Sequence, residues 1–214
     1  TNLLYRVNNL LSLAALRPAL RPGARVLEVG GGAGSFAHLL SQEPDVQLGA
    51  YVFTDGALPF LRRAQRVLPD LAPNLPLHVQ RLDLDLPLDA QGLADQTFDA
   101  IVAINVLHVV RDLPRTLADL RAHLAPGGRL VLGECLKPSL DTPLYLEGCF
   151  QFIRSFRDVT LHPQLRPTPG FLTPEHWVAL LRHVGFSEVL EIPHTRPLMA
   201  RYACFNVGAF AGFA

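Results

Sequence analysis

The apolar and polar positions of this 214-residue chain follow two periods, one helical and one typical of buried strands. Residues 3–16 place apolar side chains at helical spacing, and the prolines and glycine at 18–23 end the expected helix. From residue 25 onward, short apolar runs alternate with segments of helical periodicity. We expect strands at 25–29, 50–54, 77–82, 98–104 and 129–134, and helices at 34–42, 57–68 and 112–124.

The strand-like runs are nearly continuously apolar, which is typical of parallel strands that are buried on both faces. Their alternation with helices predicts an α/β fold: a Rossmann-like, mostly parallel seven-stranded sheet with helices on both faces and a terminal antiparallel strand pair. A turn is expected at 126–128, where a proline precedes two glycines. The terminal pair is expected at 186–192 and 200–207, after a helix that begins at Thr173 and ends before Gly185.

Composition and charge narrow the class of protein. Lys+Arg and Asp+Glu both number 19, so the formal net charge is zero and nothing predicts a nucleic-acid or membrane-surface partner. No apolar run approaches the roughly 20 residues that span a bilayer, and no signal-peptide pattern is visible. The three cysteines are scattered and form no metal-ligand cluster, so we expect no metal site and a reduced, cytoplasmic protein.

The stretch VLEVGGGAGSF at 26–36 is the first candidate site, because ligands of open α/β sheets bind at the carboxyl ends of strands. The spacing is Glu28-x-Gly30-x-Gly32-x-Gly34. Ser35 stands where the dinucleotide fingerprint requires its third glycine, and the Gly-Lys-Ser/Thr of a P-loop is absent. The loop therefore does not match either of the two common phosphate-binding patterns.

Glu28 at the mouth of this loop indicates a cationic ligand. Beside a pyrophosphate, its carboxylate would be a like charge in a partly desolvated place, which is costly. S-adenosylmethionine carries a sulfonium and an ammonium but no phosphate, and its flat body requires a close approach to the backbone. The loop therefore predicts S-adenosylmethionine as cofactor; the alternative is a tight strand-to-helix turn with an incidental glutamate.

Acidic residues also follow the second and third expected strands. Asp55 is placed to accept both ribose hydroxyls, as acids at this position do in nucleotide-binding folds; the alternative is an N-cap of the next helix. Asp83 is placed to accept the adenine amino group, with Leu84 beside the ring. The alternative for Asp83 is a solvated loop acid.

These motifs resemble those of class I S-adenosylmethionine-dependent methyltransferases, and within that class the C-methyltransferase domains of polyketide synthases. The resemblance covers residues ~25–207. It is carried by YVFTDGALPFLRRA (51–64), LDLDLPLDAQG (82–92), FDAIVAINVLH (98–108), LAPGGRLVLGE (124–134) and TPEHWVALLRHVGF (173–186). It implies that the glycine loop holds the methionine part of the cofactor and that Asn105 of NVLH lies beside the cofactor.

His108 and Glu134 form the candidate catalytic pair. His108 follows the fourth expected strand and Glu134 ends the fifth, and these two strands are neighbours in the expected topology. A histidine held by a carboxylate is a general base with a fixed tautomer. The resemblance implies that this pair deprotonates the carbon between the two carbonyls of a β-ketoacyl thioester. The alternative is a helix-capping histidine and a solvated strand-end glutamate.

The aromatic-rich stretch 139–172 is expected to wall the acceptor pocket, although ordinary packing under a long loop is an equal alternative. The candidate wall residues are Leu144, Tyr145, Phe150, Phe152 and Phe156. Three arginines in this stretch, Arg154, Arg157 and Arg166, suit an attraction to a phosphopantetheine arm or an acidic carrier protein. A solvated face is the simpler interpretation of these arginines.

The expected domain organisation has an N-terminal helical lid at 1–22 and a methyltransferase core at 23–214, with the acceptor-pocket insertion at about 136–172. Tyr5 and Asn8 on the first helix are placed to close over the site. The absence of an initial methionine suits a domain taken from a longer protein.

The expected function is methyl transfer from S-adenosylmethionine to the α-carbon of a carrier-bound β-ketoacyl thioester, in secondary metabolism of the polyketide type. The acceptor is a small molecule or an acyl-carrier-protein-bound chain, and the protein is a free-standing enzyme or part of a larger synthase. The alternatives are a small-molecule O-methyltransferase and an inactive cofactor-binding module of a megasynthase. A nicotinamide oxidoreductase is disfavoured by Glu28 and Ser35.

Overall fold

A computed structural model describes residues 3–214, apart from the side chains of Leu146 and Cys149. The strands are β1 (Arg25–Val29), β2 (Ala50–Asp55), β3 (Leu77–Arg81), β4 (Phe98–Ile104), β5 (Leu124–Cys135), β6 (Glu188–Ile192) and β7 (Val207–Phe213). The α-helices are α1 (Leu3–Leu16), α2 (Ser35–Ser41), α3 (Leu58–Leu71), α4 (Leu113–Ala122), α5 (Tyr145–Phe150), α6 (Arg154–Arg157), α7 (Pro174–His183) and α8 (Thr195–Arg201). Short 3₁₀ turns are η1 (Arg17–Ala19), η2 (Asp89–Gln91) and η3 (Leu107–Val109).

The strands form one seven-stranded sheet in the order β3-β2-β1-β4-β5-β7-β6. The pairings from β3 to β5 are parallel, and β7 is antiparallel to both of its neighbours, β5 and β6. The predicted fold class is therefore confirmed. This order places β1 and β4 at the centre, where the crossover direction reverses and where ligands of open α/β sheets bind.

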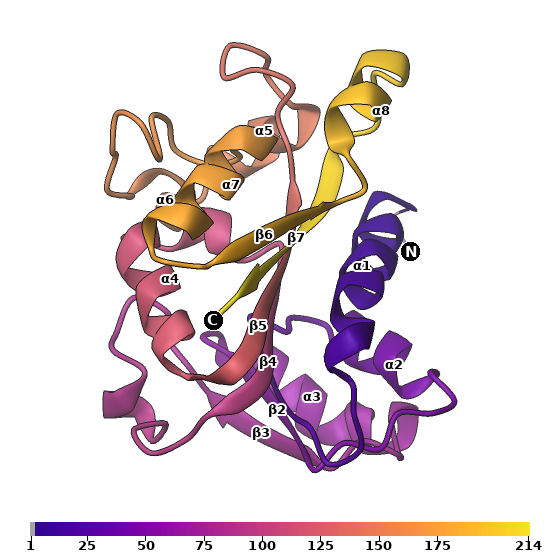
Figure 1. Cartoon of the computed structure of the whole chain (residues 1–214). Coiled ribbons are helices and arrows are strands. Elements are labelled where there is room, and N and C mark those ends of the chain that lie inside the picture. Colours follow the sequence, from indigo (N-terminus) through magenta and orange to yellow (C-terminus); the bar gives the residue numbers. More distant parts are fainter. Residues whose placement is uncertain (1–2) are drawn as a thin grey trace.

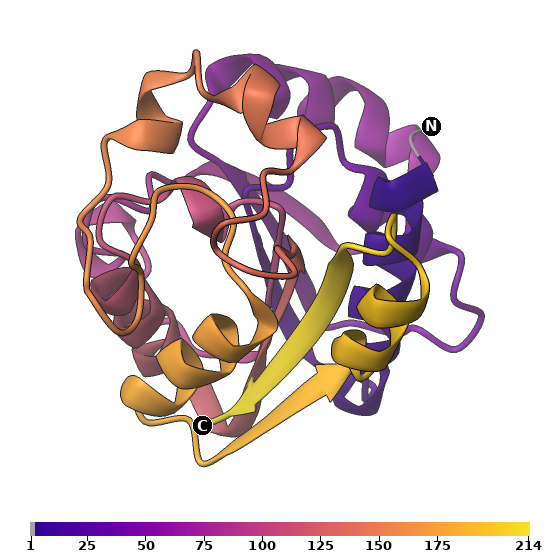
Figure 2. The same ribbon diagram turned by 90° about the horizontal axis from the view of Figure 1, so that it is seen from above.

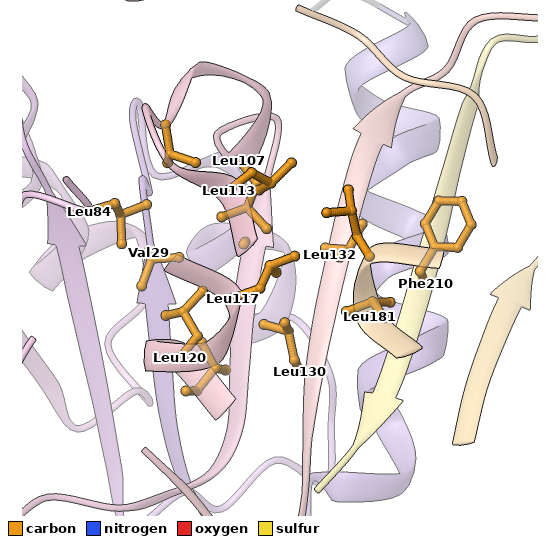
Figure 3. Close-up of a cluster of buried hydrophobic side chains, with 14 of the residues drawn as sticks. Val29, Leu84, Leu107, Leu113, Leu117, Leu120, Leu130, Leu132, Leu181 and Phe210 are labelled. Carbon is orange, nitrogen blue, oxygen red and sulfur yellow. The ribbon is translucent and has the colours of Figure 1, made fainter. Parts of the chain in front are cut away.

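Helices cover both faces of the sheet (Figure 1). One core cluster joins apolar residues of α1, α2 and α3 to the sheet, and a second joins residues of α4 and α7 to the opposite face. Figure 3 shows Leu117 and Leu120 of α4 against Leu130 of β5 in the second cluster. Each such fully buried leucine contributes about 1.5–3 kcal/mol relative to exposure, so the clusters fix the sheet that carries the site.

The expected turn at 126–128 is part of a longer strand than the sequence predicted. β5 begins at Leu124, and its register against β4 shifts between the pairs Phe98–Leu124 and Ala100–Arg129. Gly127 adopts a φ of 73° within this irregularity. The Pro-Gly-Gly sequence therefore produces a bulge inside β5, which the apolar pattern of 129–134 alone did not indicate.

The last strand was predicted at 200–207, and this placement is wrong. Residues 195–201 form α8, and β7 runs from 207 to 213 between β5 and β6. Its glycines and alanines have low strand propensity, but they suit this crowded position: a Cβ on Gly212 would lie 2.7 Å from the Phe186 ring. The position of β7 is therefore explained by its burial between β5 and β6 and not by the strand propensity of its residues.

The stretch between β5 and α7 contains the short helices α5 and α6 and is tied to the core by a parallel bridge between Leu136 and Leu172. It lies over the end of the sheet at which β5 finishes, as the orange segment in Figures 1 and 2 shows. None of the helices within 3–214 has the length and apolar character that crossing a membrane requires.

Candidate active site

The glycine loop between β1 and α2 has the conformation that its sequence requires. Gly30, Gly32 and Gly34 all have positive φ values, of 66°, 53° and 79°. Gly34 is the N-cap of α2, and the amide of Gly31 donates to the carbonyl of Thr54 at the end of β2. Only glycine adopts several such conformations in succession without strain, so the loop turns tightly over the carboxyl ends of β1 and β2.

The same glycines allow close packing on one side and leave the backbone open on the other. A Cβ on Gly30 would lie 2.3 Å from Val106, and one on Gly31 would lie 2.2 Å from the Phe53 ring. By contrast, a Cβ on Gly32 would meet only the carbonyl oxygen of Gly30, at 4.0 Å. The backbone at Gly32 is therefore open to a ligand that binds by close approach.

We expect Gly31→Ala to destabilise the protein by about 1–3 kcal/mol, because the new methyl group would overlap the buried Phe53 ring. The affinity for S-adenosylmethionine should fall as well, since the loop must shift to make room. Thermal unfolding and calorimetric titration measure the two effects. Gly127→Ala is the control without a steric overlap, because no heavy atom lies within 4 Å of its Cβ position. Gly127 has a positive φ, unlike Gly31, so this variant carries its own backbone strain but leaves the cofactor loop unchanged. Equal loss of cofactor affinity in both variants would contradict the packing argument.

Glu28 is buried beneath the loop, with 2% of its surface exposed. Its Oε2 accepts a 2.6 Å hydrogen bond from the hydroxyl of Tyr51 on β2. Burial raises the pKa of Glu28 to about 8; the Tyr51 hydrogen bond opposes this rise, and the nearby Asp55 charge adds to it. The carboxyl is therefore protonated at neutral pH in the free protein, and a cation nearby would favour its ionised form.

Asp55 connects the glycine loop to the end of β2. Its Oδ2 accepts from the amide of Gly32 at 2.9 Å, and its Oδ1 accepts from the amide of Ala57 at 2.8 Å, just before α3. The second bond places Asp55 at the start of α3, next to the N-cap Ala57. Both cofactor candidates on this edge, Asp55 and Gly32, thus lie within one hydrogen bond of each other.

The loop after β3 is held from inside by Gln91. The Gln91 side-chain oxygen accepts from the amide of Asp83 at 2.8 Å, and its Nε2 donates to the Asp83 carbonyl at 2.9 Å. The Asp83 carboxylate accepts from the amide of Asp85, and Leu84 is buried. Gln91 belongs to the quoted LDLDLPLDAQG stretch, but the sequence did not show that it supports Asp83.

Asn105 joins the carboxyl end of β4 to the first helix. It has a φ of 51°, which is uncommon for a residue with a side chain, and its amide donates to the carbonyl of Gly133 on β5. Its Oδ1 accepts from Nδ2 of the buried Asn8 at 3.1 Å. Asn9 of the same helix donates to Ser35 at the start of α2. α1 is thus hydrogen-bonded to both sides of the central crevice.

The structure brings His108 and Glu134 together, as the sequence predicted. His108 lies in the turn η3 and Glu134 on the neighbouring strand β5, and His108 Nδ1 lies 2.8 Å from Glu134 Oε2. The other oxygen, Oε1, accepts from the amides of Leu107 at 3.0 Å and His108 at 3.4 Å. Both side chains are buried. Because Glu134 occupies Nδ1, Nε2 is the ring nitrogen that remains for a ligand.

Aromatic rings surround the imidazole of His108. Its ring centroid lies 4.6 Å from that of Phe171, 5.9 Å from Phe156 and 6.3 Å from Phe150. A cavity of about 190 Å³ opens beside these rings. It is lined by Tyr5, Asn105, His108, Val109, Cys135, Phe150, Ile153, Ser155, Phe156 and Phe171. Burial raises the pKa of the Cys135 thiol to about 12, so it remains protonated and lines the cavity as a weakly polar group.

Three of the five aromatic residues predicted to bind the acceptor line this cavity: Tyr5, Phe150 and Phe156. Tyr145 and Phe152 lie outside its wall, with 87% and 88% of their surfaces exposed. Tyr145 is exposed at the start of α5 and Phe152 in the turn between α5 and α6, and the aromatic composition of 139–172 could not distinguish exposed from buried positions. The sequence missed Phe171, which lies just before α7 and has the shortest ring distance to His108.

The solvated face proposed for the three arginines is wrong for Arg166. Its side chain is completely buried and donates to main-chain carbonyls beside His108. No periodic pattern surrounds Arg166, so the sequence carried no signal for this burial. Arg154 is exposed, as expected for a solvated residue.

Comparison with known proteins shows which proteins this chain resembles. Residues 27–130 match the family model described as "Methyltransferase domain". The chain is 32% identical over 170 residues to lovastatin diketide synthase lovF of Aspergillus terreus and 36% identical over 172 residues to polyketide synthase ThaQ of Burkholderia thailandensis. Each alignment covers 78% of this chain but only 7% and 8% of these relatives, so the chain corresponds to a small part of their length.

Among solved structures, the carbon methyltransferase of CurJ superimposes with a TM-score of 0.79 at 28% identity, over 97% of this chain and 54% of that one. The glycine loop, the sheet order and this likeness define the chain as a class I S-adenosylmethionine-dependent methyltransferase, with S-adenosylmethionine as cofactor. Within that class it is similar to the C-methyltransferase domains of polyketide synthases.

Proposed function

We propose that this domain methylates the α-carbon of a carrier-bound β-ketoacyl thioester, with His108 as the general base. The observation that carries the proposal is the buried His108–Glu134 pair at the wall of an aromatic cavity. A carbon acid must lose a proton before it attacks a methyl donor, so a C-methyltransferase requires a base at the acceptor. Simple positioning is sufficient for an acceptor that is already nucleophilic.

In this proposal Nε2 of His108 takes the α-proton of the acceptor. The electron pair of the broken C–H bond then forms the new C–CH₃ bond. Glu134 fixes the tautomer of the imidazole and stabilises the imidazolium that results. Its other oxygen is held by two main-chain amides, so the carboxylate remains in place while His108 changes charge. The cofactor would supply the methyl group from its sulfonium, and the sulfur would keep the electron pair of the broken S–CH₃ bond and leave as a neutral thioether.

The cofactor residues follow the crevice across the strand ends. The loop of Gly30, Gly32 and Gly34, whose backbone is open at Gly32, would hold the methionine part, and Glu28 would favour its positive charge. Asp55 would accept the ribose hydroxyls, Asp83 the adenine amino group, with Leu84 beside the ring. Asn105 follows β4 at the carboxyl end of the strand and lines the cavity, which supports the place proposed for it beside the cofactor.

The acceptor would enter between the first helix and the insertion at about 136–172. Tyr5 lines the cavity from α1, which suits the helical lid proposed for residues 1–22. Phe150 and Phe156 line it from the insertion. The volume of about 190 Å³ suits a short β-ketoacyl group, and the large relatives support an acceptor presented by a carrier protein within a larger synthase.

The test is a reaction of the purified domain with S-adenosylmethionine and acetoacetyl-pantetheine, followed by NMR location of the new methyl group. We expect methyl on the α-carbon. Methyl on oxygen of this acceptor, or transfer only to a phenol or alcohol offered beside it, would replace the proposal by O-methylation. Cofactor binding by calorimetry without transfer to any of these acceptors would indicate an inactive binding module.

A further inference from the structure

Arg166 lies at the centre of a contact between the insertion and the turn that carries His108. Its side chain is 0% exposed and is among the largest fully buried side chains in residues 3–214. One terminal nitrogen donates to the carbonyl of Val110 at 2.6 Å and is 3.4 Å from that of Arg111. The other donates to the carbonyl of His108 at 2.7 Å. One guanidinium thus binds the main chain of His108 and of two residues that follow it.

The position of Arg166 is itself fixed by the main chain. Its amide and carbonyl both bond to His162 at 2.9 Å, which closes a tight loop in the insertion. The amide of Thr160 donates to the carbonyl of Arg111 at 2.8 Å, from the same side. The rigid loop therefore holds the guanidinium in place, and the guanidinium holds the segment from 108 to 111.

The charge of Arg166 is paired only with carbonyl dipoles. Within the described part of the chain, no carboxylate oxygen lies within ion-pair distance of it, and the acids that act on its charge are Glu134, Asp112 and Asp85. Burial lowers the pKa of Arg166 to about 10, and these three acids oppose that change. The guanidinium therefore stays positively charged at neutral pH, in a low-dielectric place next to the catalytic pair.

We propose that Arg166 is a positioning residue for the general base. Its fork of donors fixes the turn that carries His108, and it places a positive charge beside the His108–Glu134 pair. This inference rests on the proposed function, because it assigns Arg166 a role in that reaction. It explains why an arginine is completely buried here without a carboxylate partner, at a cost in desolvation that packing alone would not offset.

The contributions of the planar fork and of the positive charge of Arg166 can be separated, because lysine keeps the charge and loses the fork. A lysine at 166 retains a positive charge but binds as a point donor, without the planar fork that reaches two carbonyls at once. A methionine fills similar volume and removes both. The other groups around His108 are unchanged in these variants: Glu134 and Cys135 from β5, Tyr5 from α1, and the phenyl rings of the insertion.

The experiment compares Arg166→Lys and Arg166→Met with wild type in pH profiles of methyl transfer and in NMR titration of the His108 ring in the free protein. We expect Arg166→Met to lower kcat by about 10–100-fold and to move the acid limb and the ring titration to higher pH, because lost positive charge favours the imidazolium. Arg166→Lys should lower kcat while both midpoints remain near wild type. The affinity for S-adenosylmethionine should change less than threefold.

Arg129→Met is the matched control, because Arg129 is a partly buried arginine that donates to the carbonyl of Ala15, far from the cavity. The proposal would be overturned if Arg166→Met left the titration of the His108 ring unshifted and, like Arg129→Met, affected only stability. The ring titration needs no substrate, so it decides the role of Arg166 even where the acceptor test excludes C-methylation. Loss of C-methylation with a shifted titration would retain Arg166 as the positioning residue and reject only the acceptor.

Discussion

Replacing His108 by alanine is expected to slow methyl transfer to the α-carbon by about 10²–10⁴-fold. The variant removes the proposed base, while the residues proposed to bind the cofactor are others: the glycine loop, Asp55 and Asp83. The affinity for S-adenosylmethionine should therefore remain near that of the unaltered domain. Single-turnover transfer to a β-ketoacyl thioester and calorimetric titration of the cofactor measure the two quantities separately.

The matched control is His123→Ala. His123 is also buried and also lies beside carboxylates, Asp89 and Asp119, but it sits at the end of α4, away from the cavity. Its loss should lower stability and leave transfer largely intact. Transfer that persists in His108→Ala, or falls equally in both variants, would remove His108 from the role of base.

Glu134→Gln tests how the pair works. The amide keeps one oxygen for the amides of Leu107 and His108 but presents no negative charge to the imidazolium. We therefore expect Glu134→Gln to transfer methyl at a rate between that of wild type and that of His108→Ala. A Glu134→Gln variant with full activity would show that hydrogen bonding alone orients His108.

The sequence predicted the sheet and the strand-end residues because one physical signal determines both. Continuous apolar runs mark strands buried on both faces, and parallel strands bring their carboxyl ends to one edge. Glu28, Asp55, His108 and Glu134 all stand at or just after such ends, so the sheet order alone brings His108 next to Glu134. The weakly apolar Gly-Ala strand β7 had no such signal, and its position followed only from burial.

Contacts that depend on irregular segments could not be predicted. Arg166 reaches His108 across 58 residues of sequence, from a loop without periodicity. Gln91 supports Asp83 through a turn whose shape the sequence does not specify. The strand-end residues could be predicted because regular secondary structure fixes their positions. Arg166 and Gln91 could not, because their positions depend on how the insertion and the loops pack in the folded protein. The supporting residues of the site therefore had to come from the structure.

A second large effect is expected for Glu28, in the pH dependence of stability. Its pKa rises from an ordinary 4.5 to about 8 on folding, chiefly through burial. The folded protein then binds a proton that the unfolded chain has lost, so the stabilising contribution is complete below pH 4.5 and is lost as pH rises to about 8. The loss corresponds to a free energy on the order of 4 kcal/mol.

Glu28→Gln should abolish this dependence, because the amide cannot ionise and its oxygen can still accept from Tyr51. Chemical denaturation at a series of pH values should show wild type losing stability between about pH 5 and 8 relative to the variant. Glu188→Gln, at an exposed position on β6, is the control for removing a carboxyl group and should keep the wild-type slope. Parallel curves for Glu28→Gln and wild type would show that Glu28 is already ionised in the folded protein.

Cofactor binding provides a second measurement of the same group. A cation beside Glu28 favours its ionised form, so S-adenosylmethionine should bind wild type more tightly as pH approaches 8, and this gain should disappear in Glu28→Gln.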